Sequence, residues 1–168
     1  MNDKLIVIVG FMGCGKTAVA KELSRLLKKR CLDLDAHIQD LERRSPAQII
    51  EDDGELAFRA VETQALRAIL AAGEKGTVIA LGGGAWAIPV NRELIPALET
   101  VVVWLDAPLD LCWRRIAKDA DSRPLAPTRS AAEILFSERL PFYRLADLHV
   151  EVGDESPTQI AERIAALL

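Results

Sequence analysis

One eight-residue stretch near the N-terminus constrains this chain more than any other. Residues 10–17 read GFMGCGKT, follow the apolar run at 5–9 and open an amphipathic helical stretch. They fit the pattern G-x-x-x-x-G-K-[ST] in the strand–loop–helix context that the pattern requires. Such a loop points successive backbone N–H groups at phosphate oxygens, in glycine conformations that a Cβ would forbid, next to the positive end of a helix dipole. The sequence therefore predicts a nucleoside triphosphate site.

Two side chains of this loop have predicted partners on the nucleotide. We expect the Lys16 ammonium to reach between the β- and γ-phosphates and the Thr17 hydroxyl to ligate Mg²⁺. A glycine-rich turn that happens to precede a helix is the alternative, but such a turn does not require a Lys-Thr pair at these positions. The loop thus identifies the phosphoryl donor and leaves the acceptor open.

Length and composition fit one globular domain. The chain has 168 residues, half of them hydrophobic, which is enough for a core without disulfides or a structural metal. Its net charge of −4 argues against a nucleic-acid partner. The sequence has no apolar run of membrane-spanning length and no signal-peptide pattern, and three widely spaced cysteines without a CxxC pair are typical of reduced thiols. We expect a cytoplasmic monomer that binds neither nucleic acid nor membrane.

Apolar β-runs alternate with helical runs along the chain. The expected strands cover 5–9, 31–34, 77–81, 100–105 and 148–152. The expected helices follow the loop to about residue 30, cover 36–72 in pieces broken at 45–46 and 53–54, and then cover 109–118, 130–145 and 157–168. This alternation predicts an α/β fold: a five-stranded parallel sheet with helices on both faces.

Acidic residues at the carboxyl ends of the strands are candidates for the metal site, because ligands bind at that edge of such sheets. Asp33 and Asp35 end the second strand, and Asp106 ends the fourth. In an extended segment Asp33 and Asp35 would point the same way, one toward a metal and one toward the acceptor. Asp106 closes a more hydrophobic strand, but it also suits a cap for the following helix. Composition and spacing leave the choice between Asp33 and Asp106 open.

Further motifs follow the loop. They are DLD at 33–35, DGELAFRAVE at 53–62, LGGGA at 81–85, SRPL at 122–125 and RLPFYR at 139–144. Together with GFMGCGKT, and in this order, they resemble the motifs of the shikimate kinase family over nearly the whole chain. The resemblance implies a P-loop kinase of the nucleoside-monophosphate-kinase type that uses ATP to phosphorylate the 3-hydroxyl of shikimate.

The resemblance also assigns the donor side of the site. Arg115 and Pro157 lie where the family sandwiches adenine, although Arg114 also fits this position. Thr17 and Asp33 would hold Mg²⁺. The implied ATP-binding residues are Gly13, Cys14, Gly15, Lys16, Thr17, Ala18, Arg115, Arg123 and Pro157.

On the acceptor side, the resemblance implies that Asp35 contacts the shikimate hydroxyls and orients the attacking one. Arg59 and Arg139 would grip the substrate carboxylate. The backbone groups of Gly82 and Gly83 would assist them. Arg123 would close with a lid and stabilise charge on the transferring group. The implied catalytic residues are Lys16, Asp35 and Arg123.

The same resemblance divides one kinase domain, 1–168, into parts. It implies a core at 1–118 and 130–168, a shikimate-binding helical segment at about 33–62 and a lid at about 119–129. The lid reads RPLA where many relatives carry a second leucine, and no glutamate follows Tyr143 closely. These departures bear on lid kinetics and leave the reaction class unchanged.

Several of these residues have a plainer interpretation. Arg59 lies three and four residues from Glu62 and Glu55, so a helix-surface salt bridge is the alternative to ligand binding. For Arg139, the alternative to ligand binding is a solvated position near a helix end. We expect Glu62 to orient Arg59 or Arg139.

Rival functions differ in the acceptor. Another small-molecule P-loop kinase, of gluconate type or acting on a shikimate analogue, would share the loop and the lid. It would not need two arginines beside DLD and a triple glycine. A guanine-nucleotide switch would carry an N-K-x-D motif, and none is present.

Overall fold

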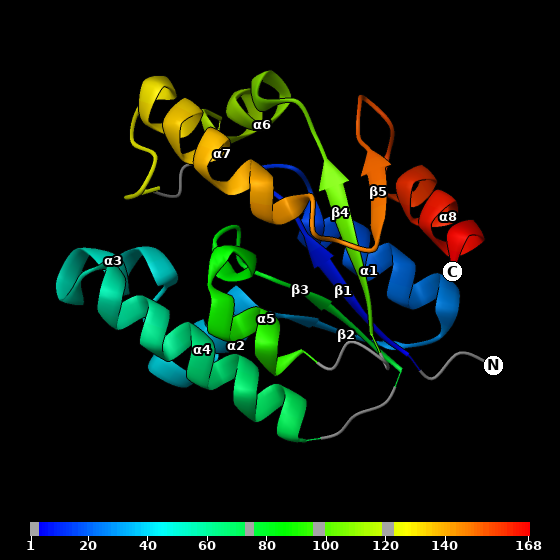
Figure 1. The fold of residues 1–168 in the computed structure, drawn as a ribbon, viewed down its shortest axis with the longest axis horizontal. Coiled ribbons are helices and arrows are strands. Elements are labelled where there is room, and N and C mark those ends of the chain that lie inside the picture. The colour runs from blue at the N-terminus through cyan, green and yellow to red at the C-terminus, as the bar shows by residue number, and fades with distance from the viewer. Residues whose placement is uncertain (1–3, 73–75, 96–99, 119–122) are drawn as a thin grey trace.

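The computed structural model describes residues 4–72, 76–95, 100–118 and 123–168. Its centre is a parallel sheet with strand order β2-β3-β1-β4-β5 (Figure 1). The strands are β1 Leu5–Val9, β2 Arg30–Asp33, β3 Thr77–Ala80, β4 Thr100–Asp106 and β5 Leu148–Glu151. The predicted α/β class, the five strands and their parallel pairing are confirmed.

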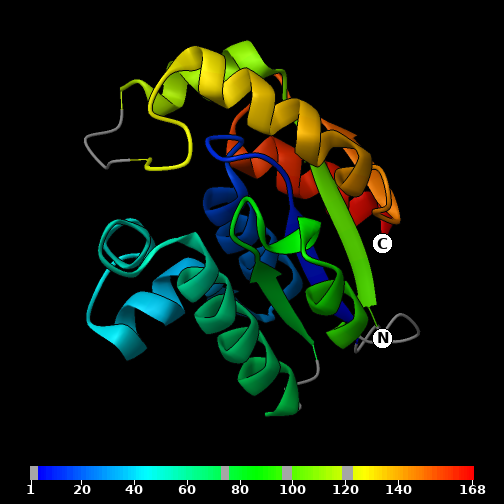
Figure 2. The same cartoon turned by 60° about the vertical axis from the view of Figure 1, so that its left-hand side comes forward.

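Helices cover both faces of the sheet. They are α1 Lys16–Leu27, α2 Leu34–Glu42, α3 Pro46–Asp53, α4 Glu55–Ala71, the 3₁₀ turn η1 Ala85–Ala87, α5 Pro89–Leu94, α6 Leu109–Ile116, α7 Arg129–Tyr143 and α8 Pro157–Leu167. Helices α1 and α8 pack together on one face, and α4, α5 and α7 lie on the other (Figures 1 and 2). Helices α2 and α3 follow β2, an edge strand of the sheet, and pack on α4. Helices α6 and α7 contact each other on the side of the loop after β1 that is opposite to α2–α4 (Figure 2).

Local sequence explains where most helices begin. Ser45 and Ser156 each accept a hydrogen bond from the backbone N–H three residues on, and the glutamine there bonds back to the serine N–H. Each of these capping boxes is followed by a proline, which suits the first helical turn. Gly54, at φ 89°, separates α3 from α4. The predicted breaks at 45–46 and 53–54 are therefore confirmed.

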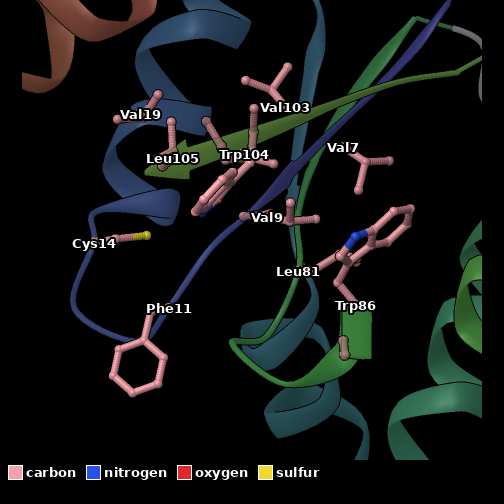
Figure 3. Packing of buried hydrophobic residues seen from close by; sticks show 14 of the residues in the cluster. Val7, Val9, Phe11, Cys14, Val19, Leu81, Trp86, Val103, Trp104 and Leu105 are labelled. Atoms are coloured by element: carbon pink, nitrogen blue, oxygen red, sulfur yellow. The ribbon is translucent and has the colours of Figure 1, made fainter. Parts of the chain in front are cut away.

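The core lies between the sheet and both helical layers. Strand β1 is buried from Ile6 to Val9, as expected for the central strand of a parallel sheet. Trp86 and Trp104 join this core (Figure 3), and Trp113 packs at its edge. Trp86 and Trp104 therefore pack in the interior, and Trp113 is partly buried. None of the described helices is long and apolar enough to cross a membrane.

Two expectations about local structure were wrong. The second strand ends at Asp33, and α2 begins at Leu34, because the Asp33 carboxylate accepts the N–H of Ala36 and caps the helix. Asp35 is consequently helical, so the argument from an extended DLD segment fails. The sequence analysis also missed η1 and α5, which are too short to show a helical period.

Candidate active site

A cavity of about 420 Å³ opens at the carboxyl edge of the sheet. It collects the loop after β1, the end of β2, the triple-glycine turn after β3 and side chains from α3, α4, α6 and α7. Most residues that the sequence analysis singled out line it: Gly13, Gly15, Lys16, Thr17, Ala18, Asp33, Asp35, Arg59, Gly82, Gly83, Arg115, Arg123 and Arg139.

The loop itself has the backbone that its glycines predict. Gly13 has φ 78°, and a Cβ there would lie 2.7 Å from the carbonyl oxygen of Cys112 on α6, so no other residue fits. The Lys16 Nζ donates to the carbonyls of Gly10 and Phe11 at 3.0 Å each, which keeps the ammonium over the loop. Cys14 is buried and does not line the cavity, so its side chain packs beneath the loop.

Thr17 and Asp33 meet on the floor of the cavity. The Thr17 hydroxyl donates a hydrogen bond to Oδ2 of Asp33, while Oδ1 of the same carboxylate caps α2. A hydroxyl and a carboxylate side by side are hard oxygen donors of the kind that Mg²⁺ prefers. Among the described residues, no group of three or more acidic, histidine or cysteine side chains is arranged to hold a metal ion by itself. An Mg²⁺ ion held by one carboxylate, a hydroxyl and nucleotide phosphates does not require such a cluster.

Asp106 has neither of the two roles that its sequence position suggested, a metal ligand beside the loop or a cap of the following helix. It does not line the cavity, and α6 starts after Pro108 with no side-chain cap. Its backbone lies opposite Glu151 in the register of β4 with β5. Burial raises the pKa of the Asp106 carboxyl, which the neighbouring His149 opposes and Glu151 reinforces. Of the two acids left open by the sequence, Asp33 is the one beside the loop.

Asp35 projects from the first turn of α2 toward the glycine turn. Its Oδ1 and the Oε1 of Glu62 are buried, and neither has a hydrogen-bond partner among the described residues. A Cβ at Gly82 would lie 2.7 Å and 2.9 Å from these two oxygens, so both carboxylates pack directly against that glycine. Burial, and then the charge of Asp33, raise the pKa of Asp35, while Lys16, Arg123 and Arg59 oppose the rise.

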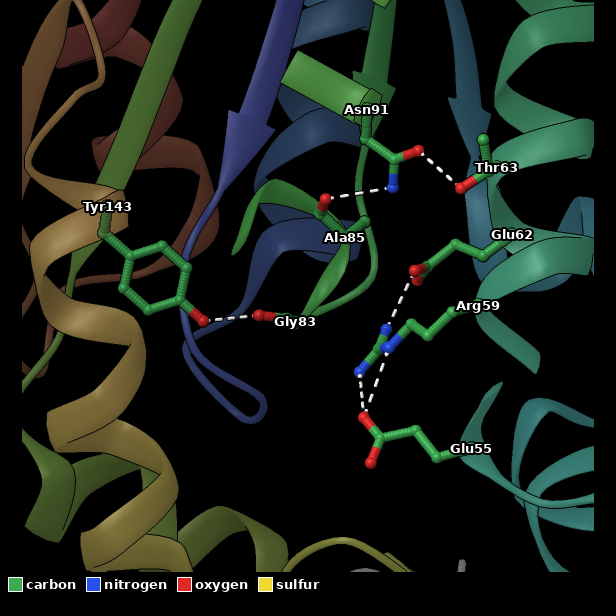
Figure 4. A network of polar contacts seen from close by, with 8 residues as sticks. All are labelled: Glu55, Arg59, Glu62, Thr63, Gly83, Ala85, Asn91 and Tyr143. Carbon is green, nitrogen blue, oxygen red and sulfur yellow. Dashed lines mark hydrogen bonds and ion pairs between the residues drawn. The ribbon is translucent and has the colours of Figure 1, made fainter. Parts of the chain in front are cut away.

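Arg59 is both salt-bridged and part of the cavity wall. It donates to Glu55 Oε1 at 3.1 Å and to Glu62 Oε2 at 2.8 Å (Figure 4). Burial lowers the pKa of Arg59, but the carboxylates of Glu62 and then Glu55 outweigh this effect, and the pKa of Arg59 is raised. The expectation that Glu62 orients Arg59 is confirmed, and the salt bridge and the cavity position are compatible.

Arg139 is buried, which excludes a solvated position near a helix end. It lies on α7 and is only 5% exposed. Burial lowers the pKa of its guanidinium, the nearby Tyr143 hydroxyl opposes this, and the charge of Arg59 lowers it further. Tyr143 in turn donates a hydrogen bond to the carbonyl of Gly83 (Figure 4). The sequence analysis missed this bond, since its partners are 60 residues apart.

Arg115 lies against the phosphate loop and lines the cavity, and Arg114 does not line it. The Arg115 Nη1 donates to the carbonyls of Gly13 and Cys14 at 3.2 Å each, whereas Arg114 pairs with Asp154. Pro157 is the first residue of α8 and does not line the cavity, so the structure does not bring it together with the other predicted residues.

Arg123 enters the cavity together with Pro124 and Leu125. Pro46, Ala47 and Ile50 of α3 also line it, and the sequence analysis missed them, because apolar residues in a short helix carry no sign of a ligand. Part of the predicted lid, residues 119–122, lies outside the described residues.

The fold and the site define a P-loop kinase: a phosphate loop and an acid at the centre of a parallel sheet, facing a second group of polar side chains across one cavity. The family model for shikimate kinase matches residues 12–168. The chain therefore belongs to the shikimate kinase family.

Individual relatives agree with this assignment. The chain is 37% identical to a shikimate kinase from Prochlorococcus marinus, over all of this chain and 87% of the relative. It is 39% identical to one from Lactococcus lactis, over 95% of this chain and 94% of the relative. Among solved structures, a shikimate kinase from Acinetobacter baumannii in complex with shikimate superposes with a TM-score of 0.90 at 33% identity, covering 98% of this chain and 92% of that one.

Proposed function

We propose that this protein transfers the γ-phosphoryl group of ATP to the 3-hydroxyl of shikimate, giving shikimate 3-phosphate. Family membership supports the reaction class. The observation that supports this acceptor is that two guanidinium groups, one buried (Arg139) and one partly buried (Arg59), meet over the glycine turn. A Cβ at Gly84 would overlap Nη2 of Arg59 and lie 2.8 Å from Nη2 of Arg139. Two forks at one point suit a substrate carboxylate.

On the donor side, the loop amides and Lys16 would hold the ATP phosphates. Arg115 is assigned to the adenine side because its guanidinium lies against the loop. Pro157 stays a prediction. Thr17 and Asp33 would hold Mg²⁺, and this ion would neutralise charge on the β- and γ-phosphates when bound.

On the acceptor side, Asp35 would receive a hydrogen bond from the attacking hydroxyl on its buried and otherwise unpartnered Oδ1. Phosphoryl transfer passes through a loose transition state, so orientation of this hydroxyl contributes more than proton removal. Arg123 would place positive charge on the transferring group, and Gly82 and Gly83 would contribute backbone groups near the substrate.

The parts of the domain also remain proposals. We assign α2, α3 and the first turns of α4 to the shikimate-binding segment, 33–62, because Asp35 and Arg59 come from these helices. The lid at 119–129, the monomeric state and the cytoplasmic location stay predictions.

A coupled ADP-release assay tests the function. Shikimate, quinate, gluconate and nucleoside monophosphates are offered at equal concentration with ATP and Mg²⁺. We expect turnover with shikimate to exceed turnover with every other acceptor. Faster turnover of gluconate would favour the gluconate-type alternative, and no turnover of shikimate would overturn the proposal.

A further inference from the structure

Asn91 is a buried polar residue that the reaction itself does not use. It lies on α5, is fully buried and does not line the cavity. Its Oδ1 accepts the hydroxyl of Thr63 at 2.8 Å, and its Nδ2 donates to the carbonyl of Ala85 at 3.0 Å (Figure 4). Only a side-chain amide presents an acceptor and donors at this spacing, so the residue ties two segments together.

The two ends of this tie lie beside the carboxylate-binding residues. Thr63 follows Glu62 on α4 and comes four residues after Arg59, one helical turn away. Ala85 follows Gly84, the glycine over which the guanidinium groups meet. The Asn91 amide therefore couples the turn of α4 that carries Arg59 and Glu62 to the glycine turn.

The opposite side of the glycine turn is tied to α7. The Tyr143 hydroxyl donates to the Gly83 carbonyl, and Trp86 Nε1 donates to the carbonyl of Phe142 at 2.9 Å. Arg92, the neighbour of Asn91, donates to the Trp86 carbonyl at 2.6 Å and stacks 5.0 Å from the Phe142 ring. Adjacent residues of α5 thus reach toward α4 on one side and α7 on the other.

We propose that Asn91 is a positioning residue that sets the separation of Arg59 from Arg139 and thereby the affinity for a substrate carboxylate. The inference rests on the proposed function, since it takes the two arginines as the carboxylate site. The contacts of Asn91 favour a role in positioning Arg59 over a role in the overall stability of the fold. Helix α4 makes its main contacts with α2, α3, α5 and the η1 turn and not with the strands of the sheet. The hydrogen bond through Asn91 Oδ1 joins the turn of α4 that carries Arg59 to the segment after the glycines.

Thr63→Val tests the tie with little change in shape. Valine keeps the branched side chain but removes the hydroxyl that Asn91 accepts, whereas Thr63→Ser keeps the hydroxyl. We expect Thr63→Val to raise the KM for shikimate about fivefold, with the KM for ATP unchanged and kcat within about twofold. Thr63→Ser should restore the wild-type KM. Ile164→Val, on the buried face of α8, is a control that lowers stability away from the site.

A substrate without the carboxylate separates positioning from stability. For the primary-alcohol analogue of shikimate, Thr63→Val and wild type should have equal KM values, because arginine spacing no longer matters. Equal losses for shikimate, the analogue and ATP, or a loss that follows the melting temperature as in Ile164→Val, would overturn the inference. If Thr63→Val does not fold, Thr63→Ala takes its place, since alanine favours the helix.

The same experiment distinguishes a failure of this inference from a failure of the proposed function. A wild-type protein that does not phosphorylate shikimate overturns the function. An active wild type together with an unchanged shikimate KM in Thr63→Val and Thr63→Ala overturns the role of Asn91 alone.

Discussion

The guanidinium groups of Arg59 and Arg139 come from different helices and meet over the backbone of Gly84. Two like charges at this point repel: Arg139 is buried and Arg59 is partly buried. Burial first, and then the charge of Arg59, lower the pKa of Arg139. Glu62 and Glu55 offset the charge of Arg59, whereas Arg139 has the Tyr143 hydroxyl beside it. An anion bound between the two guanidinium groups would relieve this repulsion, which is a physical reason for a carboxylate at this point.

Gly84→Ala should fill the space over residue 84 in which the guanidinium groups of Arg59 and Arg139 come together. The new Cβ overlaps Arg59, whose guanidinium is held by two glutamates and has little room to move. We expect the KM for shikimate to rise at least about tenfold, because a displacement of about 1 Å can cost that much, while the KM for ATP stays the same. Gly153→Ala is the matched control, since its Cβ would meet only Glu155 Oε2 at 3.6 Å. Wild-type shikimate kinetics in Gly84→Ala would show that the carboxylate binds elsewhere.

Arg59→Lys should weaken shikimate binding more than it slows turnover. A lysine keeps the charge but cannot form two parallel hydrogen bonds with a carboxylate. Losing one charged hydrogen bond corresponds to a rise of about 10- to 100-fold in the shikimate KM. Steady-state kinetics with varied shikimate measure this. Arg25→Lys, in an exposed pair with Glu22 on α1, should change nothing. Unaltered shikimate affinity in Arg59→Lys would leave Arg59 as a salt-bridge residue only.

How far the sequence predicts this structure depends on the range of the interactions involved. The strand–loop–helix around Lys16 and the capping boxes at Ser45 and Ser156 are local, and they were predicted or are readable from neighbouring residues. The helical position of Asp35 was not predicted, because the Asp33 side chain caps α2 and ends the strand one residue earlier than expected.

The site follows the same division. Its residue roles came from motifs, since spacing alone left Asp33 and Asp106 equal and favoured a surface salt bridge for Arg59. The burial of Arg139 and the contact between Tyr143 and Gly83 depend on the packing of α7 over the glycine turn. No pattern within either segment encodes that contact.

The choice between Asp33 and Asp106 has a direct test in the metal requirement. Asp33→Asn removes the carboxylate that we propose as a metal ligand but keeps a residue that caps helices well, so α2 should remain intact. We expect this variant to need at least about tenfold more Mg²⁺ for half-maximal activity. Asp106→Asn should show the wild-type Mg²⁺ dependence, measured by titration at saturating ATP. The opposite result would exchange the roles of the two acids.

We expect the affinity for shikimate to fall at acid pH as Asp35 becomes protonated. This fall should occur at a higher pH than for an ordinary aspartate, because the pKa of Asp35 is raised. Burial raises its pKa first and the Asp33 charge second, and below that pKa the protonated carboxyl accepts hydrogen bonds poorly. Affinity should therefore fall as the pH drops through the raised pKa. Removing a neighbouring negative charge lowers a carboxyl pKa, so Asp33→Asn should move this fall in affinity to lower pH. Calorimetric titration with shikimate in the absence of metal measures the shift; an unmoved fall would assign it to another group.

Arg123→Ala should act on turnover rather than on binding. The side chain enters the cavity near Asp35 and contributes to the electrostatics of its carboxylate, which places positive charge on the acceptor side of the phosphate loop. Positive charge at a transferring phosphoryl group stabilises the transition state more than the ground state. We expect kcat to fall on the order of 10²- to 10³-fold, with the shikimate KM changing less. Arg25→Ala is the control, because Arg25 is exposed and pairs with Glu22 on α1, outside the cavity, and its loss should leave kcat within about twofold. If Arg123→Ala raises the shikimate KM and leaves kcat intact, Arg123 binds substrate and does not stabilise the transferring group.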